Sequence, residues 1–345
     1  MDRSDNAVEG RGKVILLGEH GVVYGHPAIA MSIDRGVRAT AALATQDLLT
    51  VEPWQVAITP RLLDEGSTDS TSAEDAAQTE PQSLLASALA HVLASYPEDR
   101  PSVHLHAEVS LPAGAGLGCS AALGVAIIRA IDACIGVARS DVQVAQAALV
   151  WEKVFHGNPS GIDHQMSARG GIGVFQRAQG FEEVSSRRPI TLVVAHSEET
   201  SSTKAMVAHV ARLRTREPQS VDKTFEAIAA LVRNGRLAIE SNDWSTLGTL
   251  MDLNQALLNS LMLSTSRLEE MCLAARDSGA YGAKLTGAGG GGCMVALVEP
   301  NDAPRVLAAL EPAPAFIVSS SRVASSSDED EPAFRSRPSD SETNG

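Results

Sequence analysis

The 345-residue sequence has few cysteines, few aromatic residues and no apolar run near the roughly 20 residues that cross a bilayer. Its cysteines, Cys119, Cys134, Cys272 and Cys293, lie far apart and form no CxxC pair. This spacing is not typical of a disulfide framework, so we expect reduced thiols. The polar N-terminus lacks the apolar segment of a secretory signal. We therefore expect a cytoplasmic protein without a membrane partner.

Basic residues are also scarce, because 28 Lys and Arg stand against 42 Asp and Glu, for a net charge of −14. Such a chain is not expected to bind nucleic acid, which requires a basic face. Part of the negative charge lies in two Ser-rich segments. We expect residues 64–82 to form a mobile surface insertion and residues 324–345 to form a disordered acidic tail.

Strand and helix patterns alternate in both halves of the chain, which predicts an α+β protein with a boundary near residue 185. The expected N-terminal domain spans residues 1–185 and the C-terminal domain residues 186–323. Apolar runs predict strands at 14–17, 102–111, 170–175 and 190–197, and helical patterns are expected at 83–96, 121–135, 204–214 and 222–234.

Two helix starts carry capping signals. Ser140 precedes Gln143 in the spacing of a capping box. In the segment "NPSGID", Asn158 is expected to cap a helix whose first residue is Pro159.

The stretch "LPAGAGLGCSAAL" (Leu111–Leu123) places three glycines directly before an apolar helix. It is either a tight turn or a cradle for an anion, since a helix N-terminus offers unpaired N–H groups. The phosphate loop GxxxxGK[ST] is excluded because Gly12-Lys13 is followed by Val14. The dinucleotide motif GxGxxG fails at its third glycine, which is Cys119 in the register that begins at Gly114.

His104 and His106 share one face of the strand before this loop. With no third ligand in the pattern, we favour a structural role over a metal site.

Four segments in order, "GKVILLGEHGVVYGHPAIA", "LPAGAGLGCSAAL", "HGNPSGID" and "KLTGAGGGGC", resemble the signature blocks of the mevalonate kinases, a family of the GHMP small-molecule kinase superfamily. The resemblance implies a two-lobed α+β GHMP kinase fold. A nucleotide-binding lobe would precede a ferredoxin-like lobe, with the active site in the cleft between them. It also implies ATP-dependent phosphorylation of the C5 hydroxyl of (R)-mevalonate to 5-phosphomevalonate.

The resemblance further implies that loop 112–121 binds ATP with Mg²⁺. The expected nucleotide-binding residues are Pro112, Gly114, Ala115, Gly116, Leu117, Gly118, Cys119, Ser120 and Ala121. Ser120 and Glu152 are the expected metal ligands, and Mg²⁺ prefers such oxygen donors. The alternative for Glu152 is an exposed helix glutamate, although its neighbours "ALVWEKVF" are largely apolar.

Asp163 and Lys13 are the expected catalytic residues. Asp163 lies near a helix start, where the helix dipole lowers a carboxyl pKa. We expect it to orient the acceptor hydroxyl and to take its proton late. Lys13 would stabilise the developing negative charge. The alternative is that the two residues form a structural salt bridge.

The substrate is expected to contact both catalytic residues and a second set, made of Glu19, His20, Thr203, Gly287 and Ala288. The resemblance places His20 at the mevalonate end of the site. Plainer alternatives remain: His20 as a packing or turn residue, and the Ser and Thr residues near position 203 as an N-cap.

The sequence departs from the family pattern in three places. Cys119 replaces a usual Ser, and a thiol at a helix N-terminus should have a lowered pKa and be sensitive to oxidation. Gly10-Arg11 replaces Ala-Pro, and His164 replaces the Asn that commonly follows the catalytic Asp. The last two changes would affect the fit of the substrate.

Two other functions stay open at this point. A kinase of the same fold could act on phosphomevalonate or a sugar, with a decarboxylase less favoured. A silent nucleotide sensor would be expected to lose Lys13, Glu152 or Asp163, which are all present. The sequence also leaves the oligomeric state open, with a homodimer as one option.

Overall fold

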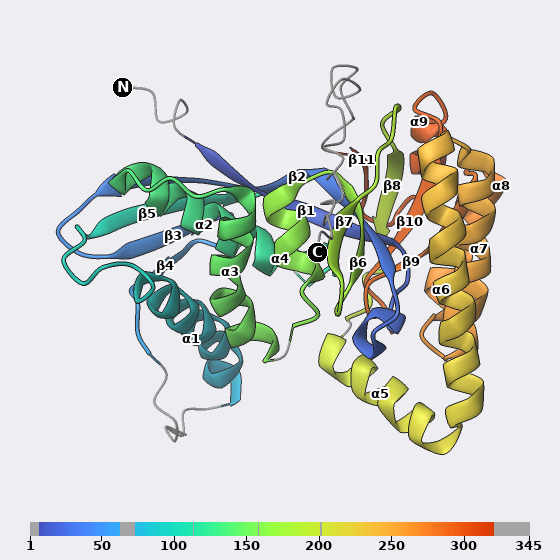
Figure 1. The fold of residues 1–345 in the computed structure, drawn as a ribbon, viewed down its shortest axis with the longest axis horizontal. Helices are drawn as coiled ribbons and strands as arrows, with labels where there is room; N and C mark the ends of the chain where they lie inside the picture. Colours follow the sequence, from blue (N-terminus) through green and yellow to red (C-terminus); the bar gives the residue numbers. More distant parts are fainter. Residues whose placement is uncertain (1–6, 63–72, 113, 158, 201, 321–345) are drawn as a thin grey trace, which may run out of the picture.

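The computed structural model describes residues 7–62, 73–112, 114–157, 159–200 and 202–320, and it shows the predicted α+β architecture (Figure 1). The tail predicted at 324–345 lies outside the described residues, as do positions 64–72 of the predicted insertion. Positions 73–82 of that insertion are helical, and its mobility stays a prediction. Their Ala, Glu and Gln residues are strong helix formers and extend the helix expected from residue 83.

In the described part of the chain, the N-terminal lobe holds a seven-stranded sheet. Its strands are β1 (Val8–Leu17), β2 (Ala28–Leu43), β3 (Leu48–Glu52), β4 (Val56–Ile58), β5 (Val103–Val109), β6 (Ile172–Gln176) and β7 (Gly180–Glu183). The order is β4-β3-β5-β2-β6-β7, with β1 paired to β2. All pairs are antiparallel except β3 with β5. The sequence pattern indicated β1, β5 and β6 and missed the short strands β3, β4 and β7.

Four helices complete this lobe: α1 (Ala73–Leu93), α2 (Cys119–Ile135), α3 (Asp141–His156) and α4 (Ile162–Arg169). Helix α2 packs on β1, β2 and β5, and α3 packs on α1, α2 and α4. The predicted capping box at Ser140 and Gln143 is present at the start of α3.

The predicted start of α4 was wrong. Its N-cap is Gly161, so Pro159 precedes the helix, and Asn158 lies outside the described residues. Gly161 has a φ of 101°, and a Cβ there would lie 2.8 Å from the Phe175 ring. The helix therefore begins after this glycine, three residues later than the predicted first residue, Pro159.

The C-terminal lobe holds a four-stranded antiparallel sheet in the order β11-β8-β10-β9, counted over the described residues. Its strands are β8 (Thr191–His196), β9 (Gly282–Thr286), β10 (Cys293–Val298) and β11 (Ala315–Ser319). Numbered within this lobe, the strand order is 4-1-3-2 with helices after the first and third strands. This is the predicted ferredoxin-like arrangement.

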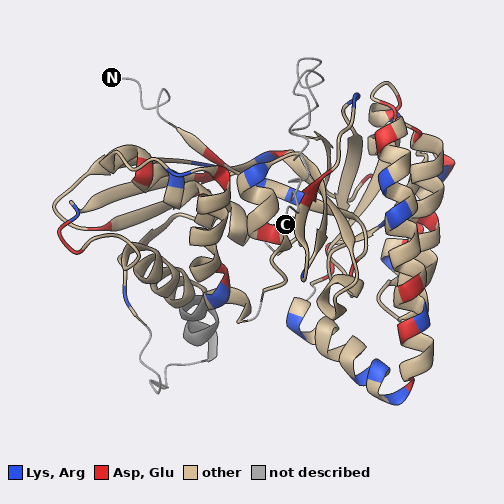
Figure 2. Ribbon diagram, in the orientation of Figure 1, with Lys and Arg blue, Asp and Glu red and all other residues tan. Residues whose placement is uncertain are grey.

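The helices of this lobe are α5 (Thr203–Arg216), α6 (Pro218–Ser241), α7 (Trp244–Ser260), α8 (Ser266–Asp277) and α9 (Ala303–Ala309). Helices α7 and α8 cover the sheet beside α6 (Figure 1). Figure 2 shows acidic and basic residues interspersed along α6, α7 and α8, which is not the pattern of a basic nucleic-acid-binding face. Among the described residues, no helix combines the length and apolarity needed to cross a membrane.

The two lobes share part of their core. Val194 and Val295 of the second sheet belong to the same apolar cluster as Val14 and Leu16 of β1. The connection between β7 and β8 contains the boundary predicted near residue 185. The limits of the two domains stay predictions.

Strands β1 and β2 meet α2 at an unusually close contact. A Cβ on Gly10 would lie 1.9 Å from the Ala122 carbonyl oxygen, and one on Gly36 would lie 2.1 Å from the Gly10 carbonyl oxygen. Gly10 is therefore the residue at which β1 contacts α2, the helix after the glycine loop. It is also one of the positions where the sequence departs from the family pattern.

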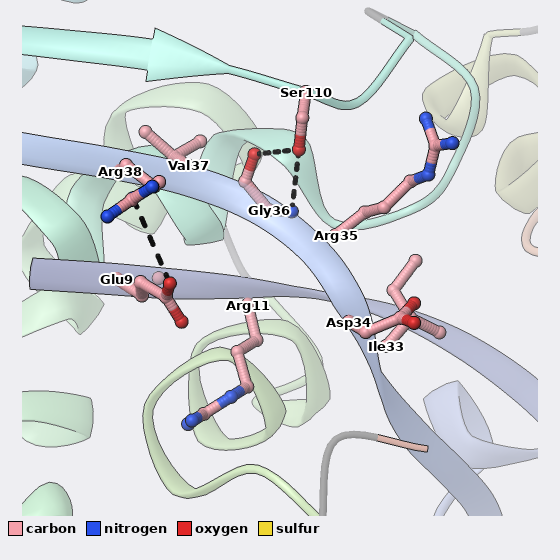
Figure 3. A pocket seen from close by; sticks show the side chains of 10 residues that line it. Glu9, Arg11, Ile33, Asp34, Arg35, Gly36, Val37, Arg38 and Ser110 are labelled. Carbon is pink, nitrogen blue, oxygen red and sulfur yellow. Dashed lines mark hydrogen bonds and ion pairs between the residues drawn. The ribbon is translucent and has the colours of Figure 1, made fainter. Parts of the chain in front are cut away.

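A pocket of about 100 Å³ lies beside this contact (Figure 3). Ser110 Oγ accepts a hydrogen bond from the Gly36 N–H at 3.0 Å and donates one to the Gly36 carbonyl at 2.8 Å. Arg38 faces Glu9 across the two strands, at 3.9 Å. The ten residues that line the pocket include none of the predicted site residues.

Replacing Gly10 with alanine should destabilise the fold by roughly 1–3 kcal/mol, because the new methyl group would press on rigid backbone. Gly21→Ala is the control, since a Cβ there meets His26 Cβ at an ordinary 3.5 Å. Thermal unfolding of both variants measures the difference. Equal melting temperatures would contradict the close approach of β1 and α2.

Candidate active site

In the glycine loop, residues 114–118, glycines with positive φ alternate with residues whose side chains are buried. Gly114, Gly116 and Gly118 have φ values of 70°, 74° and 73°, in the left-handed region that favours glycine. Between them, the side chains of Ala115 and Leu117 are buried in the core. Left-handed residues in alternation, directly before a helix N-terminus, form the kind of backbone concavity that binds anions.

The loop's ends differ in burial: Pro112 is half-buried and Ala121 is buried within α2.

Lys13 on β1 joins this loop to α4. Its Nζ lies 2.9 Å from Asp163 Oδ1 and donates to the Gly116 carbonyl at 3.1 Å. Its backbone N–H donates to the Leu117 carbonyl at 2.9 Å. A Cβ on Gly118 would lie 3.0 Å from Lys13 Cγ, so the glycine leaves room for the lysine stem. The structure therefore brings together the two residues predicted to be catalytic.

Asp163 has a lowered pKa, as predicted. Burial would raise the pKa of this carboxyl, but the charge of Lys13 and its hydrogen bond outweigh burial and hold the pKa below its usual range. The side chain is still 29% exposed. Asp163 is thus an ionised carboxylate at neutral pH that remains accessible to a small molecule. Lys13 is the main cause of the lowered pKa, whereas the sequence led us to expect the helix dipole to be the cause.

Glu152 on α3 is buried, with 1% of its side chain exposed, so the alternative of an exposed helix glutamate was wrong. Ser120 Oγ donates to Glu152 Oε1 at 2.9 Å, and His156 Nε2 lies 3.9 Å from Oε2. Burial and the nearby charge of Asp163 raise the pKa of Glu152 to about 8.

The Ser120–Glu152 pair fits a Mg²⁺ ion. Within the described residues there is no cluster of three or more His, Cys, Asp or Glu that could hold a metal. Mg²⁺ does not require one, because it is commonly bound through one or two protein oxygens with phosphates and water as the remaining ligands. A buried carboxyl that ionises only at high pH would gain most from a nearby cation.

Part of the C-terminal lobe reaches the same place. His20 Nε2 lies 2.8 Å from the Ala288 carbonyl, which makes Nε2–H the donor. Burial lowers the pKa of His20, so its ring is neutral near pH 7. Gly287 has a φ of 90°, and a Cβ on it would lie 3.7 Å from Gly116 Cα. The turn that holds Gly287 and Ala288 therefore packs against the glycine loop, which we also call the phosphate loop below because of its expected ligand.

The structure does not group Glu19 and Thr203 with these residues. Glu19 is fully buried and ion-paired with Lys284 of β9. Thr203 is the exposed first residue of α5, whose N-cap is Ser202, with a side chain that accepts a hydrogen bond from Ala205 N at 3.2 Å. The N-cap alternative therefore describes this segment.

Sequence reasoning missed Lys284. The only signal was a lysine within the apolar strand "GAKLT".

Cys119 differs from its sequence-based expectation. Its thiol packs against the core, and burial raises its pKa to about 12. The predicted lowering of this pKa was therefore wrong, because desolvation outweighs the helix N-terminus, and the sensitivity to oxidation expected from it loses its basis. His164 is buried too, and burial lowers the pKa of its ring.

Comparisons with known proteins agree with this geometry. Residues 83–171 match the family model described as "GHMP kinases N terminal domain", and residues 220–314 match "GHMP kinases C terminal". The chain is 34% identical over 304 residues to a mevalonate kinase of Pyrococcus furiosus, covering 86% of this chain and 90% of the relative. It is 37% identical over 291 residues to a mevalonate kinase of Pyrococcus horikoshii, covering 83% and 86%.

Among solved structures, the fold is similar to the crystal structure of L. major mevalonate kinase in complex with R-mevalonate. The TM-score is 0.76 at 25% identity, and the match covers 92% of this chain and 98% of that chain.

Glu152 should make the metal-free protein less stable as the pH rises. The folded state holds this carboxyl with a pKa of about 8, against an ordinary value of 4.5, so the unfolded chain releases the proton first. The stability from the protonated carboxyl is complete below about pH 4.5 and is lost toward pH 8. Glu152→Gln removes this loss and should be more stable than wild type at pH 8, by on the order of 2–4 kcal/mol.

Chemical denaturation at pH 5 and pH 8, without metal or nucleotide, measures this effect. The gain should shrink at pH 5. Glu226→Gln, at an exposed position on α6, should change little at either pH. A Glu152→Gln protein that is less stable than wild type at pH 8 would show that the carboxylate is ionised and stabilising there.

Cys119 should resist alkylation. With a pKa of about 12 its thiolate is scarce at pH 8, so iodoacetamide should modify it at least about 100-fold more slowly than a free thiol. Mass spectrometry of the native protein measures the rate, and the unfolded protein, in which all four cysteines react, is the control. Rapid modification of native Cys119 would restore the reactive-thiol interpretation.

Proposed function

Because the chain belongs to the mevalonate kinase family of the GHMP kinases, we propose that it transfers the terminal phosphoryl group of ATP to the C5 hydroxyl of (R)-mevalonate. The products are 5-phosphomevalonate and ADP. The observation that carries this proposal is the Lys13–Asp163 pair, 2.9 Å apart and hydrogen-bonded to the glycine loop. The relatives are mevalonate kinases, and the structural neighbour holds R-mevalonate, which supports mevalonate as the acceptor.

Binding of ATP falls to the loop from Pro112 to Ala121. Its glycines leave backbone N–H groups unencumbered by side chains, and α2 adds its positive dipole end. Phosphoryl transfer requires little covalent help from the protein, so holding and neutralising the phosphates supplies most of the catalysis. Lys13 adds the positive charge closest to the loop, through its contact with Gly116.

Asp163 faces the acceptor hydroxyl. A carboxylate with a lowered pKa is a weak base, so it accepts the hydroxyl's hydrogen bond and orients the oxygen for attack. It takes the proton late, when the new P–O bond has made the hydroxyl acidic. Lys13, 2.9 Å away, stabilises both the carboxylate and the oxygen as negative charge develops.

Ser120 and Glu152 would hold Mg²⁺, as their donor atoms and burial indicate. When bound, the ion neutralises charge on the phosphate oxygens. Glu152 gives up its proton as it becomes a ligand, since its pKa is about 8 before a cation is present.

The neutral His20 and the turn at Gly287 and Ala288 line the side of the site that the C-terminal lobe supplies. A neutral imidazole adds no charge for the extra phosphate of phosphomevalonate, which favours mevalonate. The cleft location, a contact of Thr203 with substrate, the cytoplasmic location and a homodimer stay predictions.

ADP release with Mg-ATP and, in parallel, mevalonate, phosphomevalonate, galactose and homoserine tests the proposal. We expect turnover with mevalonate. Asp163→Asn and Lys13→Met should each lower kcat at least about 100-fold, because each removes a group that acts in the transition state. Asp277→Asn, at an exposed position on α8, is the matched control and should be unaffected.

The binding of ATP to Asp163→Asn, measured separately, shows whether that variant keeps its fold. Turnover with a different acceptor would keep the mechanism and change the substrate. Full mevalonate turnover in Asp163→Asn would overturn the role of this carboxylate.

A further inference from the structure

A fully buried charged network connects the two lobes behind the site. Glu19 follows β1 of the N-terminal lobe, and its Oε1 accepts a hydrogen bond from Lys284 Nζ of β9. Asn254 of α7 donates through Nδ2 to Glu19 Oε2 at 3.0 Å. All three residues have 0% exposure. We refer to Glu19, Lys284 and Asn254 as the interlobe clamp.

Stability alone does not explain the clamp. Removing two charges from water is costly, and a well-packed apolar pair of similar volume often stabilises a fold as well or better. Burial lowers the pKa of Lys284, and the Glu19 carboxylate opposes this effect only in part. Asn254 Oδ1 is buried with no hydrogen-bond partner in the described part of the chain. Burying these polar groups therefore costs free energy, and not every hydrogen-bonding atom of the network has a partner among the described residues.

Two further pairs of residues, one on each side of Glu19 in the sequence, link the same two segments. On one side, Thr286 Oγ1 accepts from Ile15 N at 3.0 Å and donates to the Ile15 carbonyl at 3.2 Å. On the other side, His20 Nε2 donates to the Ala288 carbonyl at 2.8 Å. Glu19 is adjacent to His20, and Lys284 is two residues before Thr286. The clamp therefore fixes the register between these two segments.

His20 depends on this support. Its φ is 58° and its ψ is −43°, a positive-φ conformation that is uncommon for any residue other than glycine and persists only where surrounding contacts enforce it. The contact with Ala288 places the ring toward the turn whose Gly287 packs on Gly116 of the phosphate loop. A shift of Glu19 against Lys284 would move both His20 and this turn relative to Lys13.

We propose that Glu19, Lys284 and Asn254 are positioning residues, which hold His20 and the Gly287–Ala288 turn in register with Lys13 and the phosphate loop. Glu19 thus acts on the substrate through His20 and not by direct contact. The kinetic part of this inference rests on the proposed function.

The test compares Glu19→Met, Lys284→Met and the double variant. Each single change leaves one buried charge unpaired and should lower the melting temperature strongly. The double variant replaces both charges by apolar side chains of similar length and should recover most of that loss. Its kcat/KM for the acceptor should nevertheless stay at least tenfold below wild type, while its Kd for ATP stays within about threefold.

A clamp that serves only stability predicts the opposite result, in which kcat/KM recovers together with the melting temperature. That result would overturn the proposal. Arg267→Met/Glu270→Met, which removes a surface ion pair within α8, is the control and should match wild type in kcat/KM. If the double variant does not fold, Glu19→Gln/Lys284→Met replaces it, because the amide keeps the shape of Glu19 and neither buried charge remains. The same two outcomes then apply.

A second readout does not depend on the acceptor. It is the proton NMR signal of His20 Cε1–H, which His20→Gln assigns. This signal should shift in the Glu19/Lys284 double variant (the clamp variant) and stay unchanged in the control that lacks the surface ion pair. Wild type that turns over no mevalonate would defeat the proposed function, while the His20 signal would still decide the clamp. An unchanged His20 signal in a folded clamp variant would overturn the clamp.

Discussion

The ion pair between Lys13 and Asp163 is the contact on which the rest of the site depends. It joins strand β1 to the start of α4, across 150 positions of sequence, and the same ammonium group donates to the Gly116 carbonyl. The glycine loop, the Asp163 carboxylate and the positive charge are therefore held relative to one another by a single side chain. The close approach of β1 to α2 at Gly10 places that side chain within reach.

Two carboxyl groups near this lysine have opposite properties. Asp163 contacts Lys13 directly and keeps a lowered pKa, whereas Glu152 is more deeply buried, feels the negative charge of Asp163 and has a raised pKa. Environments that push two pKa values apart assign different tasks to similar groups. Here the ionised carboxylate of Asp163 suits the proposed acceptor hydroxyl, and the buried carboxyl of Glu152, beside the Ser120 hydroxyl, suits the proposed metal ion.

The C-terminal lobe shapes the candidate site with backbone groups and by burying His20, and less by placing charged side chains there. Its glycine turn approaches the phosphate loop closely, and the neutral His20 is held to it by a carbonyl group. The charged groups that link the lobes, Glu19 and Lys284, lie in the interior behind this contact. Binding residues on loops keep their geometry only when a rigid support holds them, and the interlobe clamp is placed to be that support.

The sequence by itself determined the local features. The spacing of apolar residues predicted most long strands and helices, the Ser140–Gln143 pair predicted the start of α3, and the three glycines predicted a turn or an anion cradle before α2. These features depend on neighbouring residues, so periodicity and backbone sterics are enough to find them. The family resemblance supplied the candidate site residues Lys13, Ser120, Glu152 and Asp163.

Only the tertiary structure decided distance and desolvation. It showed that Asp163 owes its low pKa chiefly to Lys13, that burial raises the pKa of Cys119, and that Glu19 pairs with Lys284, 265 positions away. A pKa follows from the charges and the water around a group, and the chain segments that exclude water are distant in sequence. The sequence therefore identified most of the candidate site residues, but the fold determined the charge state of each one.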